Sequence, residues 1–80
     1  MLNRNMGRAT VTDPHAVAFG ARVRARRTKL GLTQEQLAER SGLHFTYVSS
    51  VERGERNVTL RTIVRLADAL DTTAAELLSR

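Results

Sequence analysis

The sequence predicts an all-α fold, a compact five-helix bundle that contains a helix-turn-helix. Apolar residues recur at the three- and four-residue spacing of a helix, and no stretch alternates with a period of two for long enough to form a strand. Helix-starting residues and single glycines divide the chain from residue 13 onward into five short segments. A chain of 80 residues can form one small domain.

The first helix is expected to begin at Asp13-Pro14 and to end at Gly31. An aspartate oxygen can accept hydrogen bonds from free N–H groups of the first turn, and proline already has the φ angle that this turn needs. Glycine is the residue that most often ends a helix in the left-handed conformation. The residues expected on the inner face are Phe19, Val23 and Leu30.

The second and third helices, with the turn between them, form the predicted helix-turn-helix. Thr33 and Gln36 have the spacing of a capping box, in which each side chain bonds to the backbone N–H of the other residue. Gly42 ends the helix that they start, and the third helix is expected over residues 44–53, closed by Gly54. The residues expected to face the core are Leu37, Ala38, Val48 and Val51.

Two further helices are predicted to complete the bundle. Thr59 caps the fourth helix, and Thr73 and Glu76 have the spacing of a second capping box at the start of the fifth. The apolar side of the fourth helix consists of Leu60, Ile63, Val64, Ala67 and Leu70, and that of the fifth consists of Leu77 and Leu78.

The chain carries an excess of positive charge, with 13 Lys and Arg against 8 Asp and Glu and a net charge of +5. Most of this excess lies before residue 32, where Asp13 is the single acidic residue. A one-sided basic field is typical of a protein that binds a polyanion such as nucleic acid. A basic protein without a specific partner has the same charge, so charge alone leaves both interpretations open.

Residues 1–12 are polar and lack a helical period, so they are predicted to form a flexible arm ahead of a DNA-binding domain at residues 13–80. The arm lacks the apolar segment of a secretory signal, and no apolar run approaches the roughly 20 residues that span a bilayer. The absence of cysteine excludes disulfides and thiolate metal sites. These features favour a cytoplasmic protein with no membrane partner.

No motif of an enzyme or a metal site occurs in the sequence. His15 and His44 lack the paired spacing of metal ligands, and the glycines occur singly rather than in a phosphate-binding loop. We therefore expect a protein that binds a macromolecule without catalysis, metal ion or cofactor.

The outer face of the third helix differs in composition from an ordinary solvated surface. Serine and threonine are mediocre helix formers because their hydroxyls compete for the backbone. In a DNA major groove, however, hydroxyls can donate to or accept from base edges, and an aromatic ring can contact a thymine methyl group. For Phe45, packing into a shallow core pocket is the alternative. The predicted outer face consists of Phe45, Thr46, Ser49, Ser50 and Arg53.

The segment "LTQEQLAERSGLHFTYVSSVERGERNVTLRTIVRLADAL" resembles the Cro/C1-type (XRE-like) helix-turn-helix family along its whole length. The preceding segment "FGARVRARRTKLGLTQ" resembles the first helix of that family, so the resemblance extends from Phe19 to about Leu78. It implies a lambda-repressor-like DNA-binding domain whose third helix enters the major groove.

The resemblance also implies roles for single residues. Arg27 and Glu52 correspond to an internal ion pair of the family, so Arg27 is expected to be structural despite its charge. Gln34 is expected to touch a phosphate through its side chain and the helix N-terminus. With the outer face, the predicted base-reading residues are His44, Phe45, Thr46, Ser49 and Ser50. The predicted DNA-backbone contacts are Gln34, Tyr47, Arg53, Arg56 and Asn57.

Within the family, "HFTYVSSVERGERNVTL" is most similar to restriction–modification controller proteins. This similarity implies a small homodimer that binds operators before its own gene and the endonuclease gene, first activating and then repressing. Phe45 departs from the controller pattern, because an arginine that reads guanine is expected at that place. The departure indicates A·T-rich contacts or a different register on the operator.

A homodimer is expected because one helix reads only a few base pairs, whereas two copies read half-sites about one helical turn apart. Glu35 and Glu39 lie on the second helix, where activators of the family contact RNA polymerase, here through its sigma subunit. An antitoxin-type repressor and a coactivator module that reads no DNA are the alternative functions. The candidate dimer residues, which could also close the core of the monomer, are Leu70, Leu77 and Leu78.

Overall fold

The computed structural model describes residues 13–79, which form helices and contain no strand. The helices of this part of the chain are α2 (Pro14–Lys29), α3 (Gln34–Ser41), α4 (Phe45–Glu52), α5 (Leu60–Ala69) and α6 (Ala74–Leu78). The prediction of an all-α fold with five helices is therefore confirmed for the described residues. The arm predicted at residues 1–12 lies outside them. None of the helices in residues 13–79 has the length and apolar character needed to cross a membrane.

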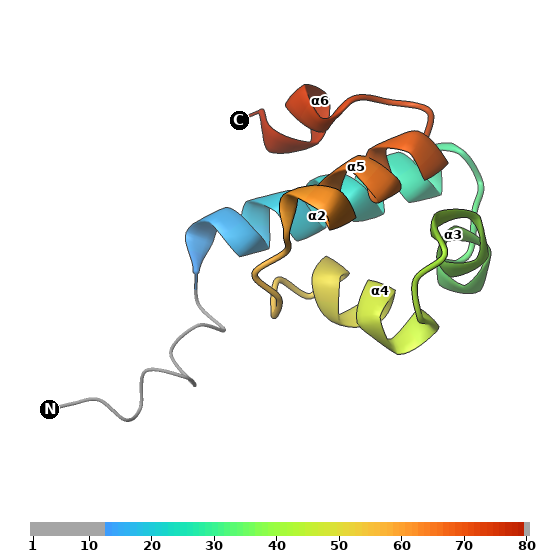
Figure 1. Cartoon of the computed structure of the whole chain (residues 1–80), viewed down its shortest axis with the longest axis horizontal. Coiled ribbons are helices and arrows are strands. Elements are labelled where there is room, and N and C mark those ends of the chain that lie inside the picture. The colour runs from blue at the N-terminus through green and yellow to red at the C-terminus, as the bar shows by residue number, and fades with distance from the viewer. Residues whose placement is uncertain (1–12, 80) are drawn as a thin grey trace, which may run out of the picture.

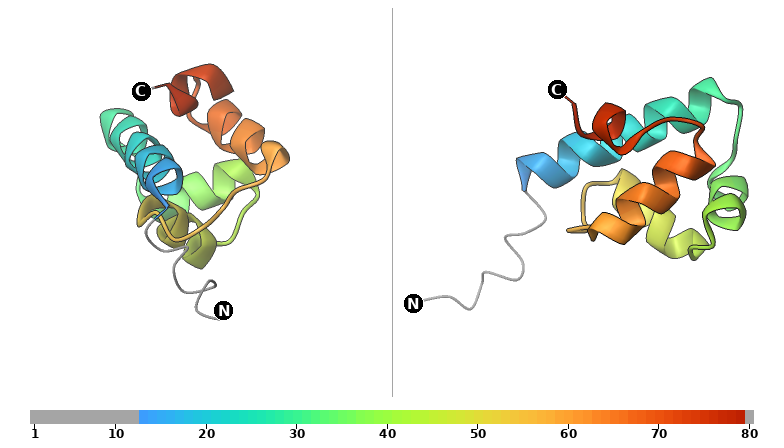
Figure 2. Two further views of the ribbon diagram at one scale, coloured as in Figure 1. Left: turned by 90° about the vertical axis from the view of Figure 1, so that its left-hand side faces the viewer. Right: turned by 45° about the horizontal axis from the view of Figure 1, so that its top comes forward.

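The long helix α2 packs against α4 and α6, while α5 packs against α3 and α6. Figure 1 shows α6 on one side of the α2 and α5 helices and the α3–α4 pair on the other side. The two further views in Figure 2 show the same separation of α6 from the α3–α4 pair. Because α3 and α4 also pack against each other across a short turn, they form the predicted helix-turn-helix.

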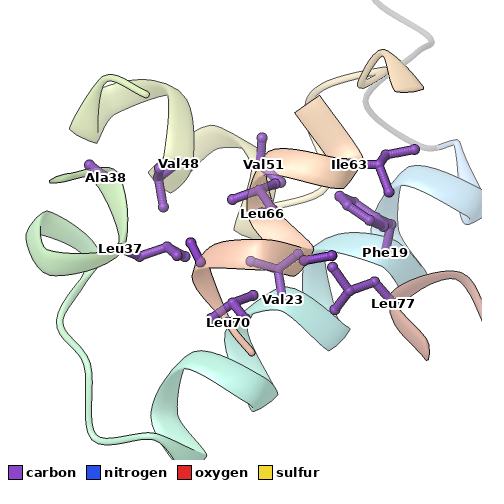
Figure 3. Close-up of a cluster of buried hydrophobic side chains, with 12 residues drawn as sticks. Phe19, Val23, Leu37, Ala38, Val48, Val51, Ile63, Leu66, Leu70 and Leu77 are labelled. Atoms are coloured by element: carbon purple, nitrogen blue, oxygen red, sulfur yellow. The ribbon is translucent and has the colours of Figure 1, made fainter. Parts of the chain in front are cut away.

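The core lies between the helices and receives side chains from all five of them (Figure 3). The predicted core residues Leu37, Ala38, Val48 and Val51 are all buried, and so are Phe19 and Val23. Leu30 is an exception, since it follows α2 as its C-cap and is exposed. Apart from Leu30, the helical spacing therefore predicted the buried apolar residues of α2, α3 and α4 correctly.

The predicted caps account for where the helices begin. The Asp13 carboxylate accepts a hydrogen bond from the His15 backbone N–H, and Thr33 and Gln36 form both bonds of the capping box. The Thr73 hydroxyl accepts a hydrogen bond from the Glu76 N–H, but within the described residues the Glu76 side chain does not return it. The second predicted box is therefore only half formed.

Gly20 sets how closely α2 and α4 approach each other. A Cβ atom at this position would overlap the carbonyl oxygen of Val51 and would lie 3.1 Å from the carbonyl oxygen of Glu52. After α4, Gly54 has a φ of +78° and lies directly against Val17 of α2. Glycine at these two places lets α4 and the loop after it pack tightly on α2.

Two of the three predicted dimer residues are wrong. Leu70 is fully buried, and Leu77 is 2% exposed, because α6 folds back onto α2 and α5 and its inner side closes the core of the monomer. Leu78, on the outer side of α6, is 54% exposed. On α5, Leu60 and Val64 are exposed although the sequence pattern placed them on the apolar side with the core residues.

Candidate nucleic-acid interface

The predicted ion pair between Arg27 and Glu52 is present and ties the end of α4 to α2. The Arg27 Nε atom donates to Glu52 Oε2 over 2.6 Å, and Arg27 Nη2 donates to Oε1 over 2.9 Å. Both side chains are largely shielded from solvent, and the bonds to Glu52 raise the pKa of Arg27 above its ordinary value. The third nitrogen, Nη1, donates to the Leu32 carbonyl oxygen over 2.8 Å. Arg27 is thus a structural residue whose charge is compensated internally.

Gln34, at the start of α3, forms a hydrogen bond with the Glu52 carboxylate of this ion pair. Its Nε2 atom donates to Glu52 Oε1 over 2.9 Å, so the Glu52 carboxylate links α2, α3 and α4. This bond uses one of the two N–H groups of the side-chain amide. A phosphate contact by the Gln34 side chain and the N-terminus of α3 stays a prediction.

The side chains at the start of α4, from His44 to Thr46, are exposed. His44 is the N-cap residue but forms no side-chain cap hydrogen bond, and Thr46 is exposed. Phe45 is 42% exposed, so the alternative in which its ring packs into a core pocket is wrong. Three predicted base-reading residues therefore stand together at the N-terminal end of the helix, which is the end that reaches base edges in helix-turn-helix proteins.

The prediction that Ser50 belongs to the base-reading face is wrong. Its side chain is buried, with 5% of the residue exposed, and its hydroxyl donates to the Tyr47 carbonyl oxygen over 2.8 Å. The reason is the path of the chain after α4: it turns at Gly54, and the Glu55 N–H donates to the Ser50 carbonyl oxygen, so the loop covers this side of the helix. Ser49, in contrast, stays partly exposed, as predicted.

Two arginines follow α4 and differ in how they are held. Both oxygens of Glu55 accept hydrogen bonds from Arg53, over 3.0 and 3.1 Å, and Arg53 Nη1 donates to the Ser49 hydroxyl over 2.7 Å. This exposed pair raises the pKa of Arg53 and lowers the pKa of Glu55. Arg56 donates through Nε to the Ser50 hydroxyl over 3.0 Å, and its Cζ atom lies 5.3 Å from the centre of the Tyr47 ring.

The other predicted contact residues lie at the surface. Asn57, next to Arg56, is exposed, and so are Glu35 and Glu39 on α3. Within residues 13–79 there is no group of three or more His, Cys, Asp or Glu residues that could hold a metal ion. No sequence pattern indicated the Glu55 partner of Arg53 or the burial of Ser50, because both depend on the fold of the loop after α4.

Taken together, the geometry provides an outward-facing helix end beside a loop with positive charges. The exposed side chains of the first turn of α4 offer an aromatic ring, a hydroxyl and an imidazole. Arg53, Arg56 and Asn57 follow the same helix on a short loop that is anchored to α2 at Gly54. Such an arrangement can place α4 in a DNA groove while the loop contacts the phosphate backbone.

Comparison with known proteins places this geometry in a family. A helix-turn-helix family model matches residues 23–77, which cover the second half of α2 and all of α3 to α5. The control protein C.SmaI of Serratia marcescens is 60% identical over 58 residues, which span 72% of this chain and 69% of the relative. The chain belongs to the helix-turn-helix controller proteins.

Solved structures agree with this assignment. The restriction–modification controller protein C.AhdI of Aeromonas hydrophila is 55% identical, with a TM-score of 0.76 over 78% of this chain and 94% of that one. The controller protein C.Esp1396I, solved as a tetramer in complex with its natural 35-base-pair operator, is 27% identical, with a TM-score of 0.72 over 82% of this chain and 97% of that one. The predicted resemblance to the controller proteins is therefore confirmed, and the chain is a helix-turn-helix transcriptional regulator.

Proposed function

We propose that this protein is the autoregulating controller of a restriction–modification system and that it binds double-stranded operator DNA as a homodimer. The observation that carries the proposal is the outward-facing first turn of α4, held on a scaffold that the Arg27–Glu52 ion pair fixes at the other end. The names of C.SmaI and C.AhdI, and the operator complex of C.Esp1396I, support the same function.

Base recognition is assigned to the exposed side chains of α4. Thr46 and Ser49 can donate to or accept from base edges, His44 can do the same at the helix start, and the Phe45 ring suits the methyl group of thymine. Ser50 is excluded from this set by its burial. The exposed ring at Phe45, where the controller pattern has arginine, favours an operator with an A·T base pair at the position that it contacts.

Backbone binding is assigned to Gln34, Tyr47, Arg53, Arg56 and Asn57. An arginine can form a bidentate contact with a phosphate, and contacts of this kind fix the register of the protein without reading sequence. Replacing Arg56 with Ala is expected to weaken binding to every sequence alike and to reduce the slope of log K against log salt by about one unit.

The dimer surface is assigned to exposed apolar side chains instead of the buried leucines. Leu60 and Val64 are one helical turn apart on α5 and share one exposed face, and Leu78 is exposed on α6. Exposed apolar side chains gathered on one face are typical of protein–protein interfaces. Sedimentation at micromolar concentration should show a dimer for the wild type and a monomer for Leu60→Glu, and a wild-type monomer would contradict the assignment.

Glu35 and Glu39 are proposed as the contact with the sigma subunit of RNA polymerase. Both are exposed on α3, which packs beside α4 and would remain accessible when α4 lies in the groove. Replacing both with Gln is expected to reduce transcription activation in vitro while operator affinity stays unchanged. A parallel loss of affinity would instead place these carboxylates at the DNA.

The test of the function is fluorescence anisotropy with the DNA upstream of the protein's own gene and a scrambled duplex of equal length. Titration at two salt concentrations should show a preference for the natural DNA of about a thousandfold or more and a steep salt dependence. Equal and weak binding to both duplexes would contradict the proposal. The exposed Phe45 and the acidic surface of α3 would then be tested as a protein-binding face.

A further inference from the structure

Ser50 is a polar side chain buried in the DNA-facing helix, and both of its hydrogen-bonding directions are used. Its hydroxyl proton is donated to the Tyr47 carbonyl oxygen over 2.8 Å, and its oxygen accepts from Arg56 Nε over 3.0 Å. A hydroxyl has one proton to donate, so the bond to Tyr47 leaves the oxygen lone pairs directed to the arginine. Many helix serines bond back to a carbonyl three residues earlier, but the second bond to a loop arginine is not part of that local pattern.

Arg56 is held from a second direction by the Tyr47 ring. The Cζ atom lies 5.3 Å from the ring centre, within the distance at which a guanidinium and an aromatic face attract each other. The two contacts fix the Nε side and one face of the guanidinium. Within residues 13–79, neither terminal nitrogen of Arg56 donates a hydrogen bond to the protein. These two nitrogens are therefore the part of the side chain that can meet a ligand.

The neighbouring Arg53 shows that such an arrangement is not automatic for an arginine in this loop. All three of its nitrogens donate to protein groups, two to Glu55 and one to Ser49. Its charge is also balanced by the Glu55 carboxylate. Of the two arginines after α4, Arg56 is the one that is both oriented and open at its terminal nitrogens.

We infer that Ser50 is a positioning residue that orients Arg56 for a bidentate contact with a DNA phosphate. The inference rests on the proposed DNA-binding function, but it assigns Ser50 a role different from base reading. An arginine that is oriented before binding loses less side-chain freedom when it meets the phosphate, and the parallel terminal N–H groups match two phosphate oxygens. The buried hydroxyl therefore acts on DNA affinity through another residue.

A double-mutant cycle tests the coupling between the two residues. Ser50→Ala, Arg56→Ala and the double variant are titrated by anisotropy on the upstream duplex and on the scrambled duplex at low salt. Ser50→Ala is expected to weaken binding two- to tenfold on both duplexes, the value of one modest hydrogen bond, and to have no further effect in the Arg56→Ala background. Equal losses in both backgrounds, or a loss on the upstream duplex alone, would overturn the inference.

Ser49→Ala is the matched control, because Ser49 accepts its hydrogen bond from Arg53 instead. Its effect is expected to be the same with and without Arg56. Alanine is a better helix former than serine, so both variants should fold, and circular dichroism melts of each would verify this. If Ser50→Ala were to unfold, Arg56→Lys provides a second variant, since lysine keeps the charge but lacks the Nε donor.

A measurement without DNA separates failure of this inference from failure of the proposed function. In ¹⁵N-labelled protein, the Arg56 Nε–Hε signal is expected to be slowed in exchange with water, and to lose that protection in Ser50→Ala but not in Ser49→Ala. If the wild type does not distinguish the two duplexes, the specific function fails, while the cycle on the scrambled duplex still reports the phosphate contact. An unprotected Arg56 signal in the wild type would overturn the positioning role itself.

Discussion

The start of α4 leaves the side chains of His44, Phe45 and Thr46 exposed, whereas the last turn is joined to α2 and α3 through the Glu52 carboxylate and a close backbone contact. At the first turn, His44 makes no side-chain cap hydrogen bond and Phe45 is 42% exposed. At the last turn, the Glu52 carboxylate accepts three hydrogen bonds, from Arg27 and Gln34, and the backbone lies directly against Gly20.

This difference shows how a short helix can be both selective and rigid. Eight residues are too few for an isolated helix to be stable in water, so α4 depends on packing and on bonds to its neighbours. Because those bonds are concentrated at one end, the other end needs none and can offer its side chains to a partner. A site of this kind is most effective when a rigid scaffold holds it, since less order has to be gained on binding.

The largest expected effect comes from breaking the fixed end. Glu52→Gln leaves the Arg27 guanidinium shielded from solvent without a counter-charge, and loss of one partner of a buried ion pair costs about 3–5 kcal/mol of the free energy of unfolding. Urea denaturation followed by circular dichroism measures this. Glu39→Gln, at an exposed position of α3, is the control and should leave the midpoint unchanged. Equal midpoints for the two variants would mean that the ion pair does not hold α4.

Gly20→Ala tests the same end through packing. In an open helix this change would stabilise the protein by up to about 1 kcal/mol, because alanine is the better helix former. Here the new Cβ would overlap the Val51 carbonyl oxygen, and a forced shift of α4 should cost about 1–3 kcal/mol and outweigh that gain. The sign of the change in thermal midpoint therefore decides the question. A more stable variant would show that α2 and α4 are not in close contact.

Phe45→Ala tests the exposed start of α4. It should affect DNA recognition and leave folding stability nearly unchanged, the opposite of the two variants above. Because the ring is substantially exposed, the free energy of unfolding should change little, whereas the lost contact with one thymine methyl group costs about 1 kcal/mol of discrimination. Anisotropy with a panel of duplexes that differ by single base pairs should show the loss at one or two positions only. A uniform loss on all duplexes would mean that the ring supports the fold of the helix and does not contact a base.

Most features that local sequence determines were predicted correctly, although the capping box at Thr73 and Glu76 is only half formed. The caps at Asp13 and Thr33 and the helix ends at glycine follow from rules that involve residues a few positions apart. The Arg27–Glu52 ion pair joins segments that are far apart in the sequence. It could be predicted only because the family resemblance implied it. For Phe45 the sequence left two alternatives, an exposed ring or a ring packed into a shallow core pocket. The structure shows the exposed ring.

The predictions that were wrong concern side chains whose burial depends on how the helices and loops pack against one another. Ser50 falls on the outer face of an isolated α4, but the loop that returns after Gly54 covers it. Leu77 and Leu78 are neighbours in sequence with the same chemistry, and only the placement of α6 buries one and exposes the other. A helical period gives the relative positions of side chains around a helix, whereas the surface that is finally buried is set by tertiary contacts.

The smallest effect is expected at the exposed Arg53–Glu55 pair, which lies just beyond the fixed end. The arginine lowers the pKa of Glu55, so the carboxylate stabilises the folded state at neutral pH, and this contribution disappears as the pH falls through the lowered pKa. Since both side chains are exposed, solvent screens the pair and the gain is small.

Glu55→Gln should therefore melt slightly below the wild type at neutral pH, and the two melting curves should converge in acid, below the ordinary range of glutamate at about pH 4. Thermal melts from pH 7 to about pH 3 measure the difference. A difference that stays constant across this range would mean that the charge of Glu55 has no part in it. Convergence would show that the charge of Glu55 holds Arg53, in contrast to Arg56, whose contacts are a buried hydroxyl and an aromatic ring.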